Sequence, residues 1–388
     1  MKNKKRLIIG ITGIRSEYDI MSSVFKEIKK SQKLNLKLIV TGAHLSKKYG
    51  YTVNEILKDG FKIAHKFKSL QETGGLESRA IGLGLQIKRL AKVIKNLSPD
   101  FIIVLGDREE SMTAGIISAY LNIPLIHIGG GDRVVGNIDD QIRHSVTKLA
   151  HIHIVTNKES KQRVLNLGEQ AFRVFNFGNP GLDRFLNTPD QKLKKIPELR
   201  NFILSDDEKY LVLIQHPLSS EFEFASQQMK ITLDAIKEIG MKTIIIYPNS
   251  DVGSNGMIKT IQSYQNLNFV KIIKNIPRNS FINILRKCSC LLGNSSCGIL
   301  EAPILKIPVI NIGNRQKARL HARNVIFVDH NKKEIINAIN YVMYNKKYRR
   351  MLSNVKNPYG DGKSSKKIVN LIEKIDINKK LLIKDITY

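Results

Sequence analysis

The chain has 388 residues, which is too long for one ordinary domain and fits two. Lysine and arginine number 63 against 34 acidic residues, but they are spread along the whole chain, and aromatic residues do not interleave with them as a nucleic-acid stacking platform requires. Three cysteines and no apolar run as long as a membrane span argue against a disulfide framework and a membrane protein, so we expect a cytoplasmic location.

The first 19 residues are basic and then apolar, as in a signal peptide. The apolar part is short, is interrupted by glycine and is not followed by a small-residue cleavage site. We therefore interpret residues 6–11 as the first β-strand.

Short apolar runs alternate with helical patterns along the first half of the chain. Strands are predicted at 6–11, 36–40, 101–105, 124–128, 151–156 and 173–177, and helices at 20–30, 78–97, 109–121, 140–150 and 158–167. Near-continuous apolar strands separated by helices predict a parallel sheet that is covered on both faces.

A polar, lysine-rich segment at 187–196 is the best candidate for a linker. After it, strands are predicted at 210–215, 243–247, 269–273, 290–292, 308–312 and 325–328, and helices at 225–239, 280–287, 298–305 and 333–344. We predict an α/β fold of two Rossmann-like doubly wound domains that face a central cleft. The predicted domains are 1–186 and 197–362, and a helix within 363–388 is expected to pack back on the first domain.

The turn after the first strand reads GITGIRSE and lacks the GxGxxG spacing of dinucleotide-binding proteins. No acidic residue ends the next strand where a ribose ligand would need one. We therefore expect no nicotinamide cofactor. Arg15, near a helix N-terminus, suits a phosphate better.

Charged residues follow two further strands of the first domain. Asp107 and Arg108 end the strand at 101–105, where Asp107 either caps a helix or belongs to a site, and Arg108 either pairs with Asp107 or meets a phosphate. The strand at 124–128 runs into three glycines and then a cluster of polar residues: His127, Asp132, Asp139, Asp140, Arg143 and His144. This cluster is either a capped helix with a solvated face or a set of carboxylates and cations for acid–base chemistry.

The second domain offers three candidate anion contacts. His216 ends its first strand and is either a structural hydrogen bonder or a diphosphate ligand. Residues 293–298, GNSSCG, place small residues at a predicted helix start with Glu301 in the first turn, which favours a ligand over a simple cap. Residues 313–317, GNRQK, add two cations at another strand end.

No metal site is predicted. Cys288 and Cys290 lack a second pair of ligands at zinc-site spacing and are interpreted as core residues. His151 and His153 share a strand face but have no third ligand at suitable spacing.

Several motifs together resemble the hydrolysing UDP-N-acetylglucosamine 2-epimerases. They are GDRE at 106–109, HIGGGD with IDDQIRHSVTKLAHIH within 127–153, GNPGLD at 178–183, QHP at 215–217, PNSDVGS at 248–254, GNSSCGILE at 293–301 and INIGNRQKAR at 310–319. TGIRSEYD at 12–19, TGAHLSKKYGYT at 41–52 and YGDG at 359–362 extend the match, so the resemblance covers most of the chain in order.

The resemblance implies a fold like that of GT-B glycosyltransferases, with UDP bound mainly by the second domain. It implies that UDP is eliminated to give a 2-acetamidoglycal, which is hydrated to a free 2-epimerised sugar such as N-acetylmannosamine for sialic or legionaminic acid synthesis. No redox cofactor is needed in that reaction. The family resemblance also implies a homo-oligomer, a dimer or tetramer. The composition and the apolar runs described above lead us to expect no nucleic-acid or membrane partner.

The resemblance also assigns roles to individual residues. Asp107 and Asp139 match acids of proton transfer, His216 faces the diphosphate, and Asp132 is the further catalytic candidate. The substrate-binding positions are Arg15, His44, Arg108, Arg143, His144, Asn249, Ser295, Ser296, Gly298, Glu301 and Arg315.

One position departs from the family pattern. Family members often carry Glu or His where this chain has Gly129, and some carry Glu where it has Asp132. Either Asp132 supplies the missing carboxylate, or the substrate is a 4-acetamido-6-deoxy sugar, or the activity is reduced. A non-hydrolysing epimerase and an impaired nucleotide-sugar-binding protein are the alternatives.

Overall fold

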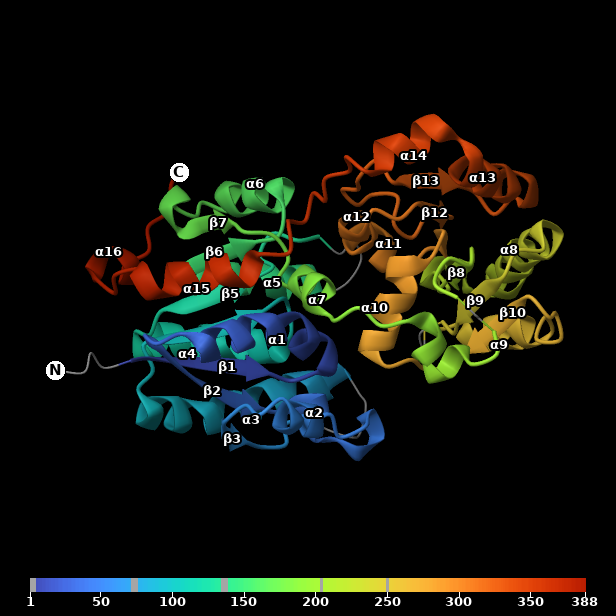
Figure 1. The fold of residues 1–388 in the computed structure, drawn as a ribbon. Coiled ribbons are helices and arrows are strands. Elements are labelled where there is room, and N and C mark those ends of the chain that lie inside the picture. Colours follow the sequence, from blue (N-terminus) through green and yellow to red (C-terminus); the bar gives the residue numbers. More distant parts are fainter. Residues whose placement is uncertain (1–4, 71–75, 134–138, 203–204, 249–250) are drawn as a thin grey trace. The chain divides into compact units, whose positions relative to one another are not determined.

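The computed structural model describes residues 5–70, 76–133, 139–202, 205–248 and 251–388 (Figure 1). The chain divides into two compact units. Unit 1 combines Met1–Arg184 with Tyr359–Tyr388, and unit 2 is Phe185–Pro358. Each unit is built on one parallel sheet with helices packed on it, which confirms the predicted α/β fold of two Rossmann-like domains.

The described part of unit 1 contains a seven-stranded parallel sheet in the order β3-β2-β1-β4-β5-β6-β7. Its strands are β1 (Arg6–Thr12), β2 (Leu34–Val40), β3 (Ile63–Lys66), β4 (Phe101–Leu105), β5 (Leu125–Ile128), β6 (Ile152–Val155) and β7 (Val174–Asn176). The chain order reverses between β1 and β4. In open α/β sheets, ligands bind beyond the carboxyl ends of the strands at such a point.

Helices cover this sheet mainly through two large hydrophobic cores. The helices of unit 1 are α1 (Arg15–Lys30), α2 (Val53–Lys58), α3 (Leu76–Leu97), α4 (Glu109–Leu121), α5 (Asp139–Leu149), α6 (Lys158–Asn166), α15 (Ser364–Lys374) and α16 (Lys379–Leu382), while α7 (Gly181–Asn187) runs on into unit 2. One core joins Phe25 of α1 and Ile368 of α15 to the sheet, and the other joins Ile94 of α3 and Ile117 of α4 to it. Full burial of such a side chain contributes about 1.5–3 kcal/mol.

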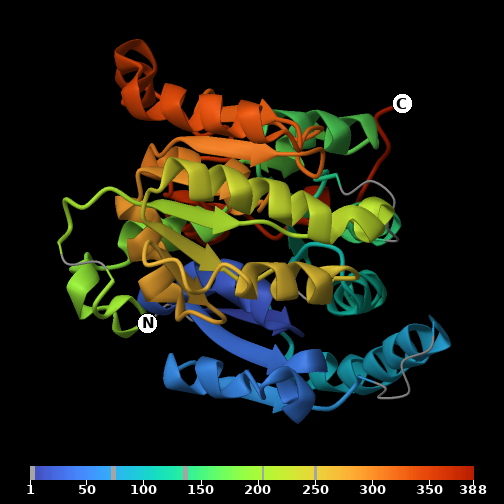
Figure 2. The same ribbon diagram turned by 90° about the vertical axis from the view of Figure 1, so that its right-hand side faces the viewer.

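Unit 2 repeats the arrangement with a sheet in the order β10-β9-β8-β11-β12-β13. Its elements are β8 (Leu211–Ile214), α8 (Ala225–Ile239), β9 (Thr243–Ile246), α9 (Ser254–Gln262), β10 (Val270–Ile273), α10 (Arg278–Lys287), β11 (Cys290–Gly293), α11 (Cys297–Leu300), α12 (Ala302–Leu305), β12 (Val309–Ile312), β13 (Val325–Val328), α13 (Lys332–Tyr344) and α14 (Lys346–Leu352). Figure 2 shows α8 and α13 over one face of this sheet, where Met229, Leu233 and Ile339 are buried.

Several elements differ from the sequence-based expectation, and the helices α2, α7, α9 and α14 lie outside the predicted helix ranges. The edge strand β3 was not predicted, because its residues are only half-buried and its apolar run is short. The helix predicted at 298–305 is two one-turn helices, α11 and α12. Pro303 lacks an N–H and its ring would clash with the carbonyl one turn back, so the pattern cannot continue as one helix. The segment at 187–196 contains a 3₁₀ turn at Leu193–Lys195, and Leu193 and Ile196 are buried.

Two of the matched motifs meet where the chain returns to unit 1. The N–H of Asn179 donates to the Tyr359 carbonyl oxygen at 2.6 Å, and Gly178 packs so closely on that carbonyl that a Cβ would lie 2.6 Å from it. The Asp183 carboxylate accepts the N–H groups of Ser364 at 3.0 Å and Ser365 at 2.7 Å. Asp183 therefore caps α15, which packs against α1 (Figure 1).

Replacing Asp183 by alanine leaves two buried N–H groups at the start of α15 without their acceptor. We expect the free energy of unfolding to fall by about 1–2 kcal/mol, and by less for Asp183→Asn, which keeps an amide oxygen. Urea unfolding measures both. A loss no larger than that of Asp376→Ala, at an exposed position of the same unit, would contradict the capping role.

Candidate active site

The carboxyl ends of β4 and β5 bring together the main acidic candidates of unit 1. Both strands end in glycines with positive φ, 78° at Gly106 and 78° at Gly129, a conformation that other residues rarely adopt. These turns place the side chains that follow them at the sheet edge.

Asp107 forms an ion pair with Arg143 of α5. Arg143 also donates a hydrogen bond to the Gly129 carbonyl oxygen at 2.8 Å and is only 7% exposed. Asp107 does not cap α4, because Arg108 takes the N-cap position. In the part of the chain that the structure describes, Arg108 does not pair with Asp107 as suggested; it pairs with Glu109 at 3.5 Å and with Glu110 at 3.6 Å.

Asp132 also lies close to Gly129. One of its carboxylate oxygens accepts the hydroxyls of Thr156 and Ser160, each at 2.6 Å. A Cβ on Gly129 would lie 3.6 Å from the Arg143 guanidinium and 3.8 Å from the second Asp132 oxygen. The space where a Gly129 side chain would begin is therefore bordered by one cation and one carboxylate.

The remaining polar residues of this cluster lie on α5 and β5. Asp139 is the first residue of α5, and Asp139 and His144 are half-buried. His127 is fully buried, and its Nε2–H donates to the Gly106 carbonyl oxygen at 2.7 Å. Burial lowers the pKa of His127 to about 3, so this imidazole is neutral and fixes the Gly106 turn.

The other unit 1 candidates follow β1 and β2. Arg15 is about half exposed and pairs with Glu55 at 3.5 Å. His44 is fully buried, and its two ring nitrogens form hydrogen bonds with Thr12 at 3.1 Å and Thr52 at 2.7 Å. Burial lowers the pKa of His44 to about 4. A neutral His44 therefore holds the loop after β2 in place.

In unit 2, Asn294 joins the ends of β8 and β11. Its side chain accepts the His216 N–H at 2.7 Å and donates to the His216 carbonyl oxygen at 2.9 Å. Gly293 has φ 109°, and a Cβ there would collide with the Ile214 carbonyl oxygen, so only glycine fits. Burial and the nearby Arg315 lower the pKa of His216 to about 4, which leaves a neutral imidazole.

The small residues after β11 form a compact turn. Ser295 and Ser296 are half-buried, and the Ser295 hydroxyl accepts the Cys297 N–H at 3.4 Å. Gly298 packs on β12, where a Cβ would lie 2.8 Å from a methyl of Val309. Arg315 donates to the Asn294 carbonyl oxygen at 3.3 Å and thus lies beside this turn.

Glu301 was expected in the first turn of a helix. It lies instead at the junction of α11 and α12. Burial raises its pKa, and the guanidinium groups of Arg278 and Arg319 oppose that shift. One Glu301 oxygen is buried with no hydrogen-bond partner within the described ranges. Arg278 at the start of α10 was not predicted, because it follows no strand end and lies in none of the matched motifs.

The cysteines and His153, most of which were considered as metal ligands, are also described by the structure. Cys288, Cys290 and Cys297 are buried free thiols, and His153 pairs with Glu169 at 2.9 Å. Among the residues that the structure describes, no group of three or more potential ligands could hold a metal ion, and no helix is long and apolar enough to cross a membrane. Asn249 lies outside the described residues.

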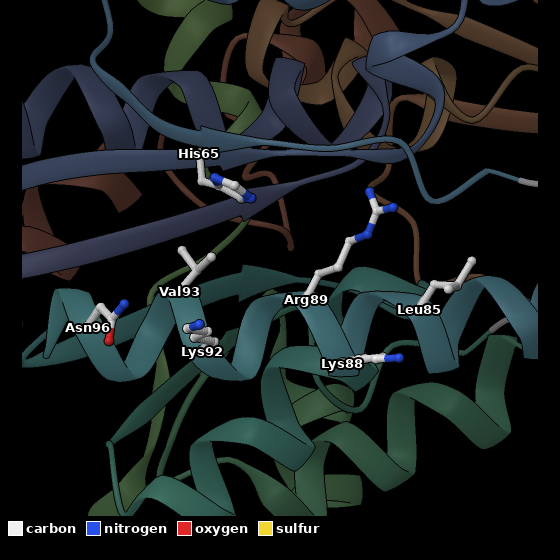
Figure 3. Close-up of a pocket in the computed structure, with 7 residues that line it drawn as sticks. All are labelled: His65, Leu85, Lys88, Arg89, Lys92, Val93 and Asn96. Atoms are coloured by element: carbon white, nitrogen blue, oxygen red, sulfur yellow. The ribbon is translucent and has the colours of Figure 1, made fainter.

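A surface groove between β3 and α3 lies apart from these residues. Figure 3 shows its lining: His65, Leu85, Lys88, Arg89, Lys92, Val93 and Asn96. Arg89 reaches across to the Lys68 carbonyl oxygen at 3.4 Å. None of the predicted site residues lines this groove, so it adds nothing to the candidate site.

Comparisons with known proteins identify the family of the chain. A family model described as UDP-N-acetylglucosamine 2-epimerase matches residues 26–373. The hydrolysing UDP-N,N'-diacetylbacillosamine 2-epimerase of Legionella pneumophila is 34% identical over 98% of this chain and 98% of its own length. The hydrolysing GDP/UDP-N,N'-diacetylbacillosamine 2-epimerase of Campylobacter jejuni is 33% identical over 83% of this chain and 84% of its own length.

Solved structures agree on the fold. The crystal structure of UDP-GlcNAc 2-epimerase from Neisseria meningitidis bound to UDP-GlcNAc superposes with a TM-score of 0.77, at 21% identity, over 95% of this chain and 100% of its own. This likeness confirms the predicted GT-B-like fold. By its sequence, which matches the family model over most of its length, the chain belongs to the UDP-N-acetylglucosamine 2-epimerase family.

Proposed function

We propose that the protein is a hydrolysing 2-epimerase that converts a UDP-linked 2-acetamido sugar into UDP and the free 2-epimerised sugar. The observation that carries the proposal is the arrangement of the Asp107–Arg143 ion pair and the Asp132 carboxylate around Gly129. Two carboxylates near one cation suit a reaction in which a proton leaves carbon 2 and another returns to it. The two relatives at 34% and 33% identity, both hydrolysing 2-epimerases, support the same reading.

In the proposed first step, a carboxylate removes the proton from carbon 2. The electron pair of that C–H bond forms the C1–C2 double bond while the C1–O bond to UDP breaks, which gives a 2-acetamidoglycal and UDP. In the second step, the electron pair of the C1–C2 double bond takes a proton at carbon 2 from the opposite face, while water adds its oxygen to carbon 1 and gives up one of its protons to a carboxylate. Asp107 and Asp132 are the proposed acid and base, with Asp139 as a third carboxylate on α5.

The unit 2 residues are proposed to hold UDP. The neutral His216 imidazole would donate an N–H to the departing diphosphate, and Arg315 beside it would stabilise the charge that develops there. Ser295 and Ser296 would contact phosphate oxygens, and Glu301 would accept the ribose hydroxyls. In unit 1, Arg15 and Arg108 are the proposed cations for the phosphates and sugar.

UDP-N,N'-diacetylbacillosamine is the proposed substrate, and UDP-N-acetylglucosamine is the alternative. The names of the two relatives cited above favour the first, and a 31% identical UDP-N-acetylglucosamine 2-epimerase of Neisseria meningitidis supports the second. The free product would then serve nonulosonic acid synthesis. Initial rates of UDP release from the two purified sugars test the choice. A higher kcat/KM with UDP-N-acetylglucosamine would reverse the assignment, and no release from either would reject the function.

Replacing Glu301 by alanine is expected to weaken UDP binding. The wild-type carboxylate is largely removed from water. Without it, UDP would lose the hydrogen bonds of its ribose, which contribute about 1.5–3 kcal/mol, so the Kd for UDP should rise roughly 10- to 100-fold. Calorimetric titration of UDP measures the change, with Glu334→Ala on α13 as the control for a carboxylate lost elsewhere in unit 2. Unchanged UDP affinity would remove Glu301 from the ribose site.

A further inference from the structure

Two buried acidic side chains that the proposed mechanism does not use meet at the turn after β1. Glu17 lies in the first turn of α1 and Glu110 in the first turn of α4, and they are 8% and 3% exposed. A carboxylate oxygen of Glu17 accepts the Gly13 N–H at 3.1 Å. The Glu110 carboxylate occupies the point where a Cβ on Gly13 would stand, so both acids contact this glycine.

Glu110 also contacts the turn after β2 and the side chain of Arg108. One of its oxygens lies 2.7 Å from the position of a Cβ on Gly42. The other lies 3.6 Å from Nε of Arg108. That oxygen and the Arg108 Nε are both buried and have no hydrogen-bond partner among the described residues, so their ion pair with each other is the interaction available to them.

Burial and neighbouring charges shift the pKa values of both glutamates. Burial and the neighbouring Glu110 raise the pKa of Glu17 to about 8, against the opposing effects of Arg108 and the backbone N–H groups of Gly13 and Ile14. Burial also raises the pKa of Glu110, which faces Arg108, Glu109 and Gln86 as well. At neutral pH Glu17 therefore holds a proton, and Glu110, whose oxygen lies 3.6 Å from Nε of Arg108, is the acid that pairs with the guanidinium.

We propose that Glu17 and Glu110 are positioning residues that share one negative charge, fix the Gly13 turn and hold the Arg108 guanidinium at the carboxyl edge of the unit 1 sheet. The inference rests on the proposed function, in which Arg108 binds the UDP-sugar. Arg15 follows Gly13 by two residues and begins α1 directly after the same turn. In this proposal, Glu17 and Glu110 act through Arg108 and do not contact the substrate.

The test compares Glu17→Gln, Glu110→Gln and the double variant, because glutamine keeps the shape of a protonated glutamate. Each single variant retains one carboxylate that can take the charge, so we expect kcat/KM within about 2-fold of wild type for Glu17→Gln and about 5-fold for Glu110→Gln. The double variant removes both buried acids and leaves Arg108 only its pair with the half-buried Glu109. Its kcat/KM is expected to fall by more than ~100-fold, well beyond the product of the single effects.

A second readout separates positioning from a purely structural role. In the wild type, kcat/KM should fall as the pH rises through about 8, because Glu17 then ionises beside Glu110. Glu17→Gln should lose this alkaline fall, whereas Glu27→Gln, which removes a carboxylate paired with Lys30 on the same helix, should keep it. Additive effects in the double variant, or an unchanged alkaline fall in Glu17→Gln, would overturn the inference.

Stability provides a readout that does not require turnover. The folded-state pKa of Glu17 lies above its ordinary value of 4.5, so the folded protein binds the extra proton, and the contribution of Glu17 to stability should decline as the pH rises from about 4.5 to about 8. Glu17→Gln should flatten this decline. If the wild type released no UDP from either sugar, the proposed function would fail, while an identical pH dependence of unfolding in both proteins would separately reject the shared charge.

Discussion

Asp107→Asn is expected to lower kcat by about 10³-fold, the scale of a lost acid–base group, while UDP still binds within about 3-fold of the wild-type affinity. Asparagine keeps an oxygen that can accept from Arg143, so the side chain retains its place. It cannot take up or deliver a proton at carbon 2. The proposed UDP contacts are the unit 2 residues together with Arg15 and Arg108 of unit 1, and Asp107 is not among them, so UDP binding should be largely unaffected.

Two measurements check this expectation: single-turnover UDP release at saturating substrate, and calorimetric titration of UDP. Asp376→Asn, an exposed change in the same unit, is the matched control and should keep wild-type rates. Urea unfolding must accompany both variants, because Arg143 loses a charged partner in a buried place. Wild-type turnover in a folded Asp107→Asn protein would remove Asp107 from the mechanism.

Asp132→Asn is expected to lower kcat by about 10²-fold or more, the lower range for a general acid or base. The variant can still accept the hydroxyls of Thr156 and Ser160, so the turn after β5 should keep its shape. If Asp132 delivers the proton in the second step, the unsaturated glycal should be released alongside UDP. Mass spectrometry of the sugar product detects it.

This variant also tests whether Asp132 supplies the carboxylate that Gly129 lacks. The Oδ2 atom of Asp132 lies 3.8 Å from the position that a Cβ on Gly129 would take. The Asp132 carboxylate can therefore replace the carboxylate that a glutamate at position 129 would supply. Turnover within about 3-fold of wild type would show that Asp132 does not fill that role and would favour a different acid, with Asp139 the next to replace.

Much of the fold was predictable because its strands are apolar and its helices periodic. The bounds of β4, α4, α8 and β13 match their predicted residues at both ends. The edge strand β3 was missed because it is short and half-buried, and the break at Pro303 depended on a local clash that hydrophobic periodicity does not report.

The sequence allowed us to predict many of the candidate site residues but few of the contacts between them. Strand-end position singled out Asp107, but its partner Arg143 lies 36 residues away and was not paired with it. Glu17 and Glu110 sit in first helical turns, where acids are common for helix stability alone, so nothing in the sequence separated them from ordinary capping acids. Such pairings come from tertiary packing.

The most direct test of the central claim is a proton NMR time course with the wild-type protein and UDP-N,N'-diacetylbacillosamine in deuterated water, repeated with UDP-N-acetylglucosamine. The proposed reaction predicts UDP together with a free 2-epimerised sugar that carries deuterium at carbon 2, because the returning proton comes from solvent. An epimerised sugar still attached to UDP would contradict the hydrolysing reaction. Release of UDP with the original configuration and no deuterium at carbon 2 would contradict the elimination route.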